Sequence, residues 1–257
     1  MSEILELARE ISEYTICGEG NVSVRAGENT FLIKASGTSL HTLSEEDLIL
    51  CNIHGVQLDP SHKKASIETS FHAWIMRTFP EINFIAHTHP PHTTKILCSS
   101  QLYQFANHRW FPDQIVRNGT KSCVVPYAPP GKAILKLVEK HVSAFVDHEG
   151  FFPKLILLQN HGIITASASK KDCAAATLMC EKSADIFIGA KLLGGVKFLT
   201  KQEVADVDTC PNENYSRTMY QCKSFMLILM KLFVIEKPPL TLEQLTIIPK
   251  QNQFQKI

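Results

Sequence analysis

The sequence lacks an excess of charge of either sign. Its 26 basic and 25 acidic side chains leave a formal net charge of +1. Nucleic acids and anionic membrane surfaces attract proteins through concentrated positive charge. We therefore expect neither nucleic acid nor a membrane as a partner.

Long apolar runs are missing as well. The most apolar stretch, residues 225–235, has about half of the roughly 20 residues that a spanning helix needs, and Lys231 interrupts it. The N-terminus is acidic and amphipathic, without the basic segment and apolar run of a secretory signal. We expect a soluble, cytoplasmic protein in which residues 225–235 form a buried helix or strand.

No C-x-x-C pair occurs among the eight cysteines, which are irregularly spaced. A cysteine zinc site, a redox motif or a disulfide framework is therefore not indicated. We expect reduced and mostly buried thiols that pack as small hydrophobic groups.

The composition is that of a globular protein, with 44% hydrophobic residues and no internal repeat. Hydrophobic periodicity and turn residues predict helices and strands that intermix without strict βαβ alternation, which favours one α/β domain of the α+β type. Helices are expected at residues 3–14, 66–79 (Ser66 as N-cap, ended by Pro80), 91–97, 131–147 and 170–194. Strands are expected at residues 18–25, 29–37, 47–59 (two short strands), 83–89, 121–127 and 154–167 (a hairpin).

Three histidines form a candidate metal site. His87 and His89 are two residues apart in a predicted strand, so both imidazoles can leave the same face. His161 follows a separate apolar strand in an Asn-His-Gly turn and is the candidate third ligand. Three protein ligands and one open position are what a catalytic zinc ion requires. A histidine can instead simply satisfy local hydrogen bonds, and His92, the nearest rival, is expected to begin the next helix.

Glu68 is the candidate acid/base group. It lies in the first turn of the predicted 66–79 helix, where the helix dipole also favours a carboxylate for structural reasons alone. That helix leads through Pro80 into the strand that carries His87 and His89. Its N-terminus can therefore meet the end of the strand at one pocket.

Six blocks of sequence resemble the class II aldolase/adducin family over roughly residues 14–194. They are GEGNVSVR, IKASGTSL, SIETSFH, INFIAHTHPPHT, VVPYAPPG and LLQNHGIITAS. The resemblance implies a single domain with a central, mainly antiparallel sheet flanked by helices. We expect this domain at residues 1–237 and a C-terminal tail at residues 238–257. Members of the family commonly form homotetramers with active sites at subunit interfaces.

The resemblance also assigns roles to residues. His87, His89 and His161 correspond to the zinc ligands, although manganese or another divalent ion is an alternative. Glu68, in the E-x-x-x-H block, corresponds to the acid/base carboxylate; the family's epimerases tend to have Asp there, so Glu favours a lyase.

The anion-binding residues of the family's sugar-phosphate enzymes correspond to glycines, hydroxyls and one amide of this chain. Backbone N–H groups of such segments can bind an anion, although the same residues also suit simple turns. These substrate-binding candidates are Gly20, Asn21, Ser36, Gly37 and Ser66.

Two departures from the family pattern leave the substrate open. Ile67 replaces a second serine before Glu68, so one donor is lost; Lys34 is either a compensating substrate-binding cation or an ordinary exposed strand lysine. The middle segment has no tyrosine to donate a proton. Asp113, its one carboxylate, is the candidate catalytic replacement, although an aspartate after proline is as often a turn residue. Tyr215 and Tyr220 are candidates for the family's tail group. The substrate anion can therefore be a phosphate or a carboxylate.

These features together predict a divalent-metal-dependent lyase. Zinc would act as a Lewis acid that stabilises the enediolate left when a carbon–carbon bond of a ketose phosphate or sugar acid breaks. Glu68 would move the proton. An aldolase or a decarboxylase fits best. The alternatives are an epimerase or dehydratase of the same fold, or a non-catalytic adducin-like scaffold.

Overall fold

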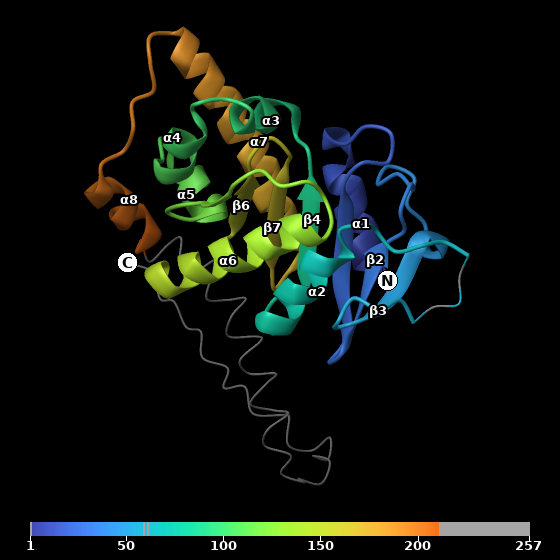
Figure 1. Cartoon of the computed structure of the whole chain (residues 1–257). Helices are drawn as coiled ribbons and strands as arrows, with labels where there is room; N and C mark the ends of the chain where they lie inside the picture. Colours follow the sequence, from blue (N-terminus) through green and yellow to red (C-terminus); the bar gives the residue numbers. More distant parts are fainter. Residues whose placement is uncertain (1, 59, 61, 211–257) are drawn as a thin grey trace, which may run out of the picture. The chain divides into compact units, whose positions relative to one another are not determined.

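Seven strands form one sheet in the computed structural model, which describes residues 2–58, 60 and 62–210 (Figure 1). The strand order is β3-β2-β1-β4-β7-β6-β5. All neighbouring strands are antiparallel except β5 and β6, which confirms the mainly antiparallel sheet. The strands are β1 (Asn21–Gly27), β2 (Thr30–Lys34), β3 (Leu48–Asn52), β4 (Phe84–Thr88), β5 (Cys123–Val125), β6 (Leu155–Leu158) and β7 (Ile163–Ser167).

Helices cover both faces of this sheet (Figure 1). Helices α2 (Thr69–Thr78) and α6 (Lys132–Glu149) pack on one face, and α1 (Ser2–Ile11) and α7 (Lys170–Leu192) pack on the other. The apolar spacing of α1 explains its position, because Ile4, Leu7, Ala8 and Ile11 are all fully buried. The remaining helices are α3 (Pro91–Leu97), α4 (Leu102–Asn107), α5 (Pro112–Asn118) and α8 (Lys201–Asp208).

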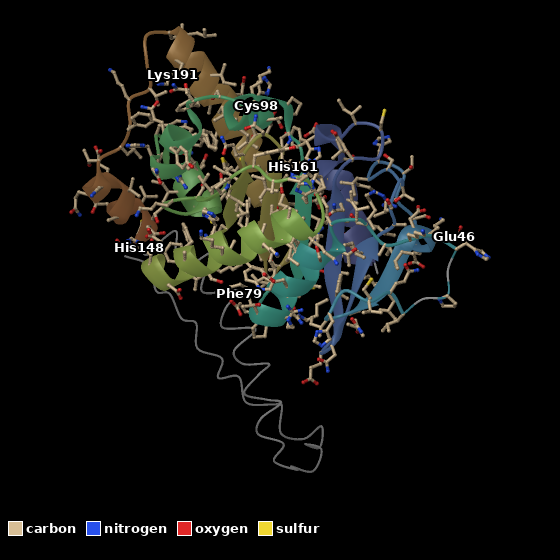
Figure 2. All side chains as sticks on the ribbon, viewed as in Figure 1. Glu46, Phe79, Cys98, His148, His161 and Lys191 are labelled. Carbon is tan, nitrogen blue, oxygen red and sulfur yellow. The ribbon has the colours of Figure 1, made fainter. Side chains whose placement is uncertain are left out.

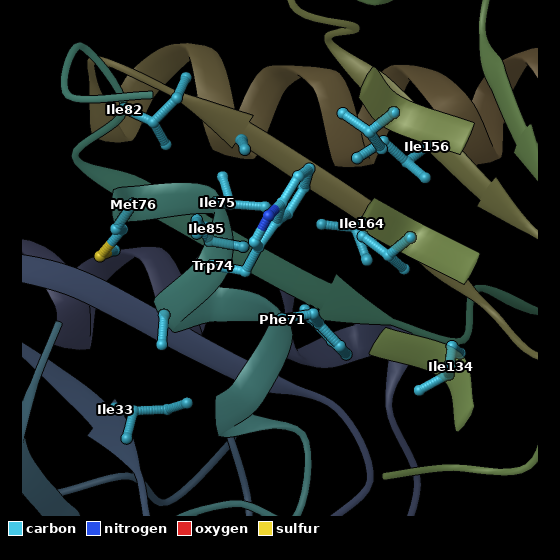
Figure 3. Close-up of a cluster of buried hydrophobic side chains, with 14 of the residues drawn as sticks. Ile33, Phe71, Trp74, Ile75, Met76, Ile82, Ile85, Ile134, Ile156 and Ile164 are labelled. Carbon is cyan, nitrogen blue, oxygen red and sulfur yellow. The ribbon is translucent and has the colours of Figure 1, made fainter. Parts of the chain in front are cut away.

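The larger part of the core lies between α2, α6 and the sheet. Phe71, Trp74 and Ile75 of α2 pack toward Ile85 of β4 and Ile164 of β7 (Figure 3). Full burial of each such side chain contributes about 1.5–3 kcal/mol to folding. This packing holds the start of α2 close to β4, where the candidate site residues lie.

Strand β4 lies at the middle of the sheet and is buried along its whole length. Its side chains alternate, because Ile85 joins the core under α2 whereas Phe84 and Ala86 join the core under α1 and α7. His87 therefore points to the same face as Ile85, toward α2.

Two predicted boundaries are wrong. Helix α2 begins at Thr69, not at Ser66, because residues 66–68 form a turn in which the Ser66 carbonyl accepts from the Thr69 N–H. Glu68 is thus the N-cap residue. The second short strand predicted within residues 47–59 is only an isolated bridge between Cys51 and Gln57. The other predicted elements are present.

Several predictions concern residues outside the described ranges. These are the apolar segment 225–235, Tyr215, Tyr220, the boundary at residue 237 and the tail 238–257. Within the described ranges, no helix is long and apolar enough to cross a membrane. The seven cysteines there are free thiols, and Cys17 and Cys98 are exposed rather than buried.

Candidate metal centre and active site

Three imidazoles meet at one end of the central strands. His87 is the fourth residue of β4, His89 follows the end of that strand, and His161 lies in the turn between β6 and β7. Strands β4 and β7 are neighbours, with Thr88 opposite Ile163, and this register carries His161 to the other two. One ligand nitrogen from each ring lies within 4.8 Å of the others. The structure thus brings together the three predicted ligands.

Gly162 permits the turn to approach His89 closely. A Cβ atom at this position would overlap the His89 ring and lie 2.5 Å from the Thr88 carbonyl oxygen. The preceding Asn160 has a positive φ of 55°, a conformation that asparagine tolerates better than most residues. Any larger residue at 162 would therefore displace His89.

Hydrogen bonds orient two of the rings. His87 Nδ1 donates to the Ile163 carbonyl oxygen at 2.9 Å, and His89 Nδ1 lies 3.2 Å from Glu19 Oε2, which can accept its proton. Both Nε2 atoms then present lone pairs, and they are only 3.0 Å apart. Two facing lone pairs repel unless a proton or a cation lies between them, so these residues fit a metal ion.

Glu19 was not identified from the sequence. A carboxylate that accepts from the second nitrogen of a ligating histidine fixes the tautomer and the ring orientation. The block GEGN contained this residue, but only its Gly-Asn pair matched the family's anion segment. Glu19 is about two-thirds buried beside His89.

The pKa values of His87 and His161 favour the neutral form that metals bind. Burial lowers the pKa of His87 well below its usual value, and the neighbouring His89 and His161 lower it further. Burial also lowers the pKa of His161, an effect that Glu68 opposes. Neutral imidazoles are the ligating species, so the site is arranged for a cation rather than for protons.

Glu68 completes the centre with a carboxylate. Its Oε2 atom lies 3.2 Å from His87 Nε2, and its Oε1 atom lies 3.5 Å from His161 Nε2. The side chain is buried, yet Oε1 has no hydrogen-bond partner. A buried carboxylate oxygen without a partner is costly unless an ion, water or substrate reaches it. Its N-cap position on α2 adds a favourable helix dipole.

Asn21 lies directly opposite His87 in the β1–β4 pair. Its Nδ2 atom donates to Glu68 Oε2 at 2.9 Å, and its Oδ1 atom accepts from His72 Nε2. Both ends of the amide are therefore bound to buried protein groups. The side chain supports Glu68, and a contact with substrate remains a prediction.

The other candidate anion segments are adjacent in space. Lys34 joins two of them, because its ammonium donates to the carbonyl oxygens of Gly18, Ala35 and Thr38. It is 2% exposed, and burial lowers its pKa to about 8. The alternative of an exposed strand lysine is therefore wrong. Lys34 is a buried residue that joins the loop of Gly18 to the loop of Ala35 and Thr38.

The remaining candidates differ in exposure. A bridge between Ala35 and Ala65 brings the loop of Ser36 and Gly37 beside Ser66. Ser36 and Gly37 are exposed, whereas Ser66 is buried and its Oγ atom accepts from the Glu68 N–H at 3.3 Å. Gly20 has a φ of +72°, and a Cβ atom there would lie 2.8 Å from the His87 carbonyl oxygen. Whether these residues bind an anion remains a prediction.

An open cleft of about 520 Å³ lies beside the triad. Figure 2 labels two of its lining residues, His161 and Cys98 of the adjoining α3 segment. The full lining is Ile16, Glu19, His89, Pro91, Thr94, Lys95, Cys98 and His161. None of the predicted substrate-binding residues is among them. Lys95 is exposed and has no ion-pair partner within the described part of the chain.

Asp113 does not line this cleft. It lies in the first turn of α5, and its side chain is 67% exposed, 3.8 Å from the Lys182 ammonium. The structure of one chain therefore does not bring it to the histidines.

Comparison with known proteins places this geometry in context. The family model "Class II Aldolase and Adducin N-terminal domain" matches residues 2–188. The chain is 31% identical over 211 residues to the 3-oxo-tetronate 4-phosphate decarboxylase of Haemophilus influenzae, covering 80% of this chain and 94% of the relative. It is 26% identical to an L-fuculose phosphate aldolase of Methanococcus maripaludis, over 72% of this chain and 94% of the relative.

The fold is similar to that of solved structures. The crystal structure of YgbL from Escherichia coli matches with a TM-score of 0.68 and 24% identity, over 81% of this chain and 97% of the other. At that identity the likeness concerns the fold alone.

Proposed function

Because this chain belongs to the Class II Aldolase and Adducin N-terminal domain family, we propose that it is a divalent-metal-dependent decarboxylase of a phosphorylated 3-oxo sugar acid. Its relatives include decarboxylases and aldolases, and the chain is an enzyme of the same superfamily. One observation carries the choice of reaction. The decarboxylase of Haemophilus influenzae aligns over 94% of its length at 31% identity.

The histidine triad supports a role for a metal ion. His87, His89 and His161 would hold the ion, with Glu68 beside it. When bound, the ion would supply a positive charge that polarises the ketone oxygen of the substrate. We propose zinc, with manganese as the alternative, because three imidazoles suit zinc well and borderline divalent ions in general.

Glu68 is the proton-transfer group of this proposal. When a 3-oxo acid loses carbon dioxide, the bond to the carboxyl carbon breaks and its electron pair passes to the carbon next to the ketone. That carbon must then gain a proton. The partnerless Oε1 atom of Glu68 is the oxygen that can donate it, since Oε2 already accepts from Asn21.

Two candidate positions exist for the substrate's negative groups. The exposed loop of Ser36 and Gly37 lies beside Ser66 and offers the Gly37 N–H and the Ser36 hydroxyl, whereas the Ser36 N–H donates to the Lys64 carbonyl oxygen. The cleft beside α3 offers the ammonium of Lys95, which has no ion-pair partner among the described residues. A phosphorylated sugar acid has two anionic ends, so the proposal uses both positions: phosphate at the loops and carboxylate toward Lys95.

Aldol cleavage of a ketose phosphate is the second candidate function. The L-fuculose phosphate aldolase of Methanococcus maripaludis supports it, over 94% of that protein's length. Both reactions break the bond between the carbon next to a ketone and the carbon that follows it, so the triad and Glu68 serve either. The groups that contact the departing carbon, a carboxylate or an aldehyde carbon, decide between the two reactions.

Asp113 fits this proposal only across a subunit contact. It is exposed and outside the cleft of its own chain. We propose a homotetramer in which Asp113 reaches a neighbouring active site and acts there as a proton donor. Asp113→Asn should then lower turnover in the assembled enzyme, and mass photometry should show the tetramer. A fully active Asn variant would remove this role.

A paired assay tests the reaction class. The zinc-loaded and manganese-loaded proteins are incubated with 3-oxo-tetronate 4-phosphate or with L-fuculose 1-phosphate. Carbon dioxide release and aldehyde release are followed separately. We expect carbon dioxide from the first substrate and little aldehyde from the second. Aldehyde release alone would replace the decarboxylase by an aldolase, and turnover of neither would refute both.

A further inference from the structure

We propose that His72 is a positioning residue that determines which oxygen of Glu68 is free to exchange a proton. A chain of hydrogen bonds links the two residues through Asn21. Ser23 Oγ lies 2.7 Å from His72 Nδ1, His72 Nε2 pairs with Asn21 Oδ1, and Asn21 Nδ2 donates to Glu68 Oε2 at 2.9 Å.

The secondary structure explains why these four residues meet. Asn21 and Ser23 are two apart on β1 and leave the same face of that strand. Glu68 and His72 are four apart, at the N-cap and in the first turn of α2, so they share one face of that helix. One pair from the strand therefore faces one pair from the helix.

Because the four residues are buried, the donor and the acceptor of each hydrogen bond in the chain are fixed. Ser23 and His72 are fully buried, Asn21 is 2% exposed and Glu68 is 6% exposed. Buried polar groups must find partners within the protein because a hydrogen bond left unmade there destabilises the fold. The donors and acceptors of the chain have to match one another.

When Glu68 is ionised, only one arrangement of donors and acceptors satisfies the whole chain. A carboxylate only accepts, so Asn21 must present its NH₂ group to Glu68 and its carbonyl oxygen to His72. His72 must then donate from Nε2, which leaves Nδ1 to accept from the Ser23 hydroxyl. The opposite tautomer of His72 would turn the Asn21 amide and place its oxygen against the carboxylate, where the two repel.

The consequence is a difference between the two oxygens of Glu68. Oε2 is held by Asn21, whereas Oε1 is buried without a partner and faces His161 at 3.5 Å. A hydrogen-bonded carboxylate oxygen is less basic than a free one. The chain from Ser23 thus directs proton transfer to Oε1.

A purely structural role is the competing explanation. His72 also stacks on Phe71, with ring centroids 4.8 Å apart, and a buried aromatic ring at this position fills the core. Removal of its nitrogens would then lower stability without a specific effect on turnover. The two explanations predict different behaviour for two substitutions of the same residue.

The activity test compares His72→Phe with His72→Gln. Phe keeps the ring and loses both nitrogens, whereas the Gln amide can place a donor near the position of Nε2. Loss of such a supporting group typically costs about 10–100-fold, so we expect kcat of the Phe variant to fall about tenfold or more. KM and metal content should stay the same, and Gln should restore most of kcat. Thr177→Val is the control, because it removes a buried hydroxyl that pairs with Thr165 elsewhere.

Three outcomes would contradict the positioning role of His72. An unchanged kcat in the Phe variant, or an equal loss in Phe and Gln that follows metal content or thermal stability, would overturn the positioning role. A loss in Thr177→Val of the same size would also do so, since that variant disturbs only the fold.

A second measurement does not depend on turnover. The inference about kcat rests on the proposed function, but the tautomer of His72 does not. Nitrogen NMR of the metal-free protein, labelled at histidine, should show His72 protonated at Nε2 and unprotonated at Nδ1. Protonation at Nδ1 would overturn the inference even in an active enzyme. The expected tautomer in a protein without lyase activity would refute only the proposed function.

Discussion

The histidine triad and the loops beside it are neighbours built in opposite ways. In the triad, side chains form the site, and other side chains or carbonyls orient them: Ile163 orients His87, and Glu19 orients His89. In the loops, Ser36 and Gly37 are exposed, and the buried ammonium of Lys34 binds carbonyl oxygens of the same segments.

The difference suits the triad to the chemical step and the loops to substrate binding. A metal ion and a proton-transfer group need atoms held in fixed positions, and rigid strands and second partners provide this. Substrate anions can instead be bound by N–H and hydroxyl groups of exposed loops. We therefore expect substitutions at the triad to affect turnover most, and those at the loops and the cleft to affect substrate affinity.

The largest effect is expected from His87→Ala. It removes a ligand from the centre of the sheet and should abolish metal binding. Lewis-acid stabilisation is worth several kcal/mol, so turnover should fall by about 1000-fold or more. Metal analysis and kcat measure the two losses. His54→Ala serves as the control, because His54 is an exposed histidine outside the triad. A variant that keeps its metal and its turnover would remove His87 from the site.

Glu68→Gln should impair proton transfer without impairing metal binding. The amide keeps the shape of the side chain but cannot act as an acid or base. Metal content should stay near that of the natural protein, while kcat falls by about 100-fold or more. The control is Glu46→Gln on the exposed surface. Turnover close to normal in the Glu68 variant would assign proton transfer to another residue.

Glu19→Gln tests whether the triad depends on its supporting residues. Loss of the carboxylate that orients His89 should weaken metal affinity by about 10–100-fold, as for other outer-shell carboxylates. Competition with a chelator measures the affinity. At saturating metal, kcat should recover most of its value. If the affinity does not change, His89 is held by other contacts.

Lys95→Met tests the cleft. If its ammonium binds the carboxylate of the substrate, KM should rise about tenfold, which corresponds to about 1.4 kcal/mol, with kcat less affected. Lys136→Met is a matched control, because this lysine is exposed on α6 and does not line the cleft. Equal KM values for the two variants would exclude Lys95 from recognition.

The smallest effect is expected from Ile67→Ser at the loops. Ile67 is 69% exposed, so the change should cost little stability. It restores a hydroxyl donor beside Glu68 and should tighten phosphate binding about threefold, the value of a modest hydrogen bond. Calorimetry with inorganic phosphate measures it. No tightening, together with an effect of Lys95→Met, would shift recognition to the cleft.

Much of this fold was predictable because local patterns agree with the tertiary contacts. The apolar stripe of α1 and the alternation of β1 and β2 produced elements at the expected places. The start of α2 was predicted three residues too early. Ser66 is a good N-cap type, but the Ala35–Ala65 bridge extends the chain past it before the helix begins.

The histidine ligands were predictable for a different reason. His87 and His89 have a two-residue spacing in a β-branched segment, and His161 has a turn motif, so each left a local signal. Lys34 left no such signal. Its burial depends on three carbonyl oxygens from loops whose paths no local pattern specifies.

The sequence by itself determined the elements, the ligand types and the family, because these depend on short-range spacing and on blocks of adjacent residues. Only the tertiary structure decided the partners. Glu19 meets His89, Asn21 meets Glu68, and His72 meets Asn21 across segments far apart in the chain. Such contacts arise from strand register and from the packing of α2 on β4. A one-residue change of register would turn Asn21 to the other face, although no residue of the sequence had changed.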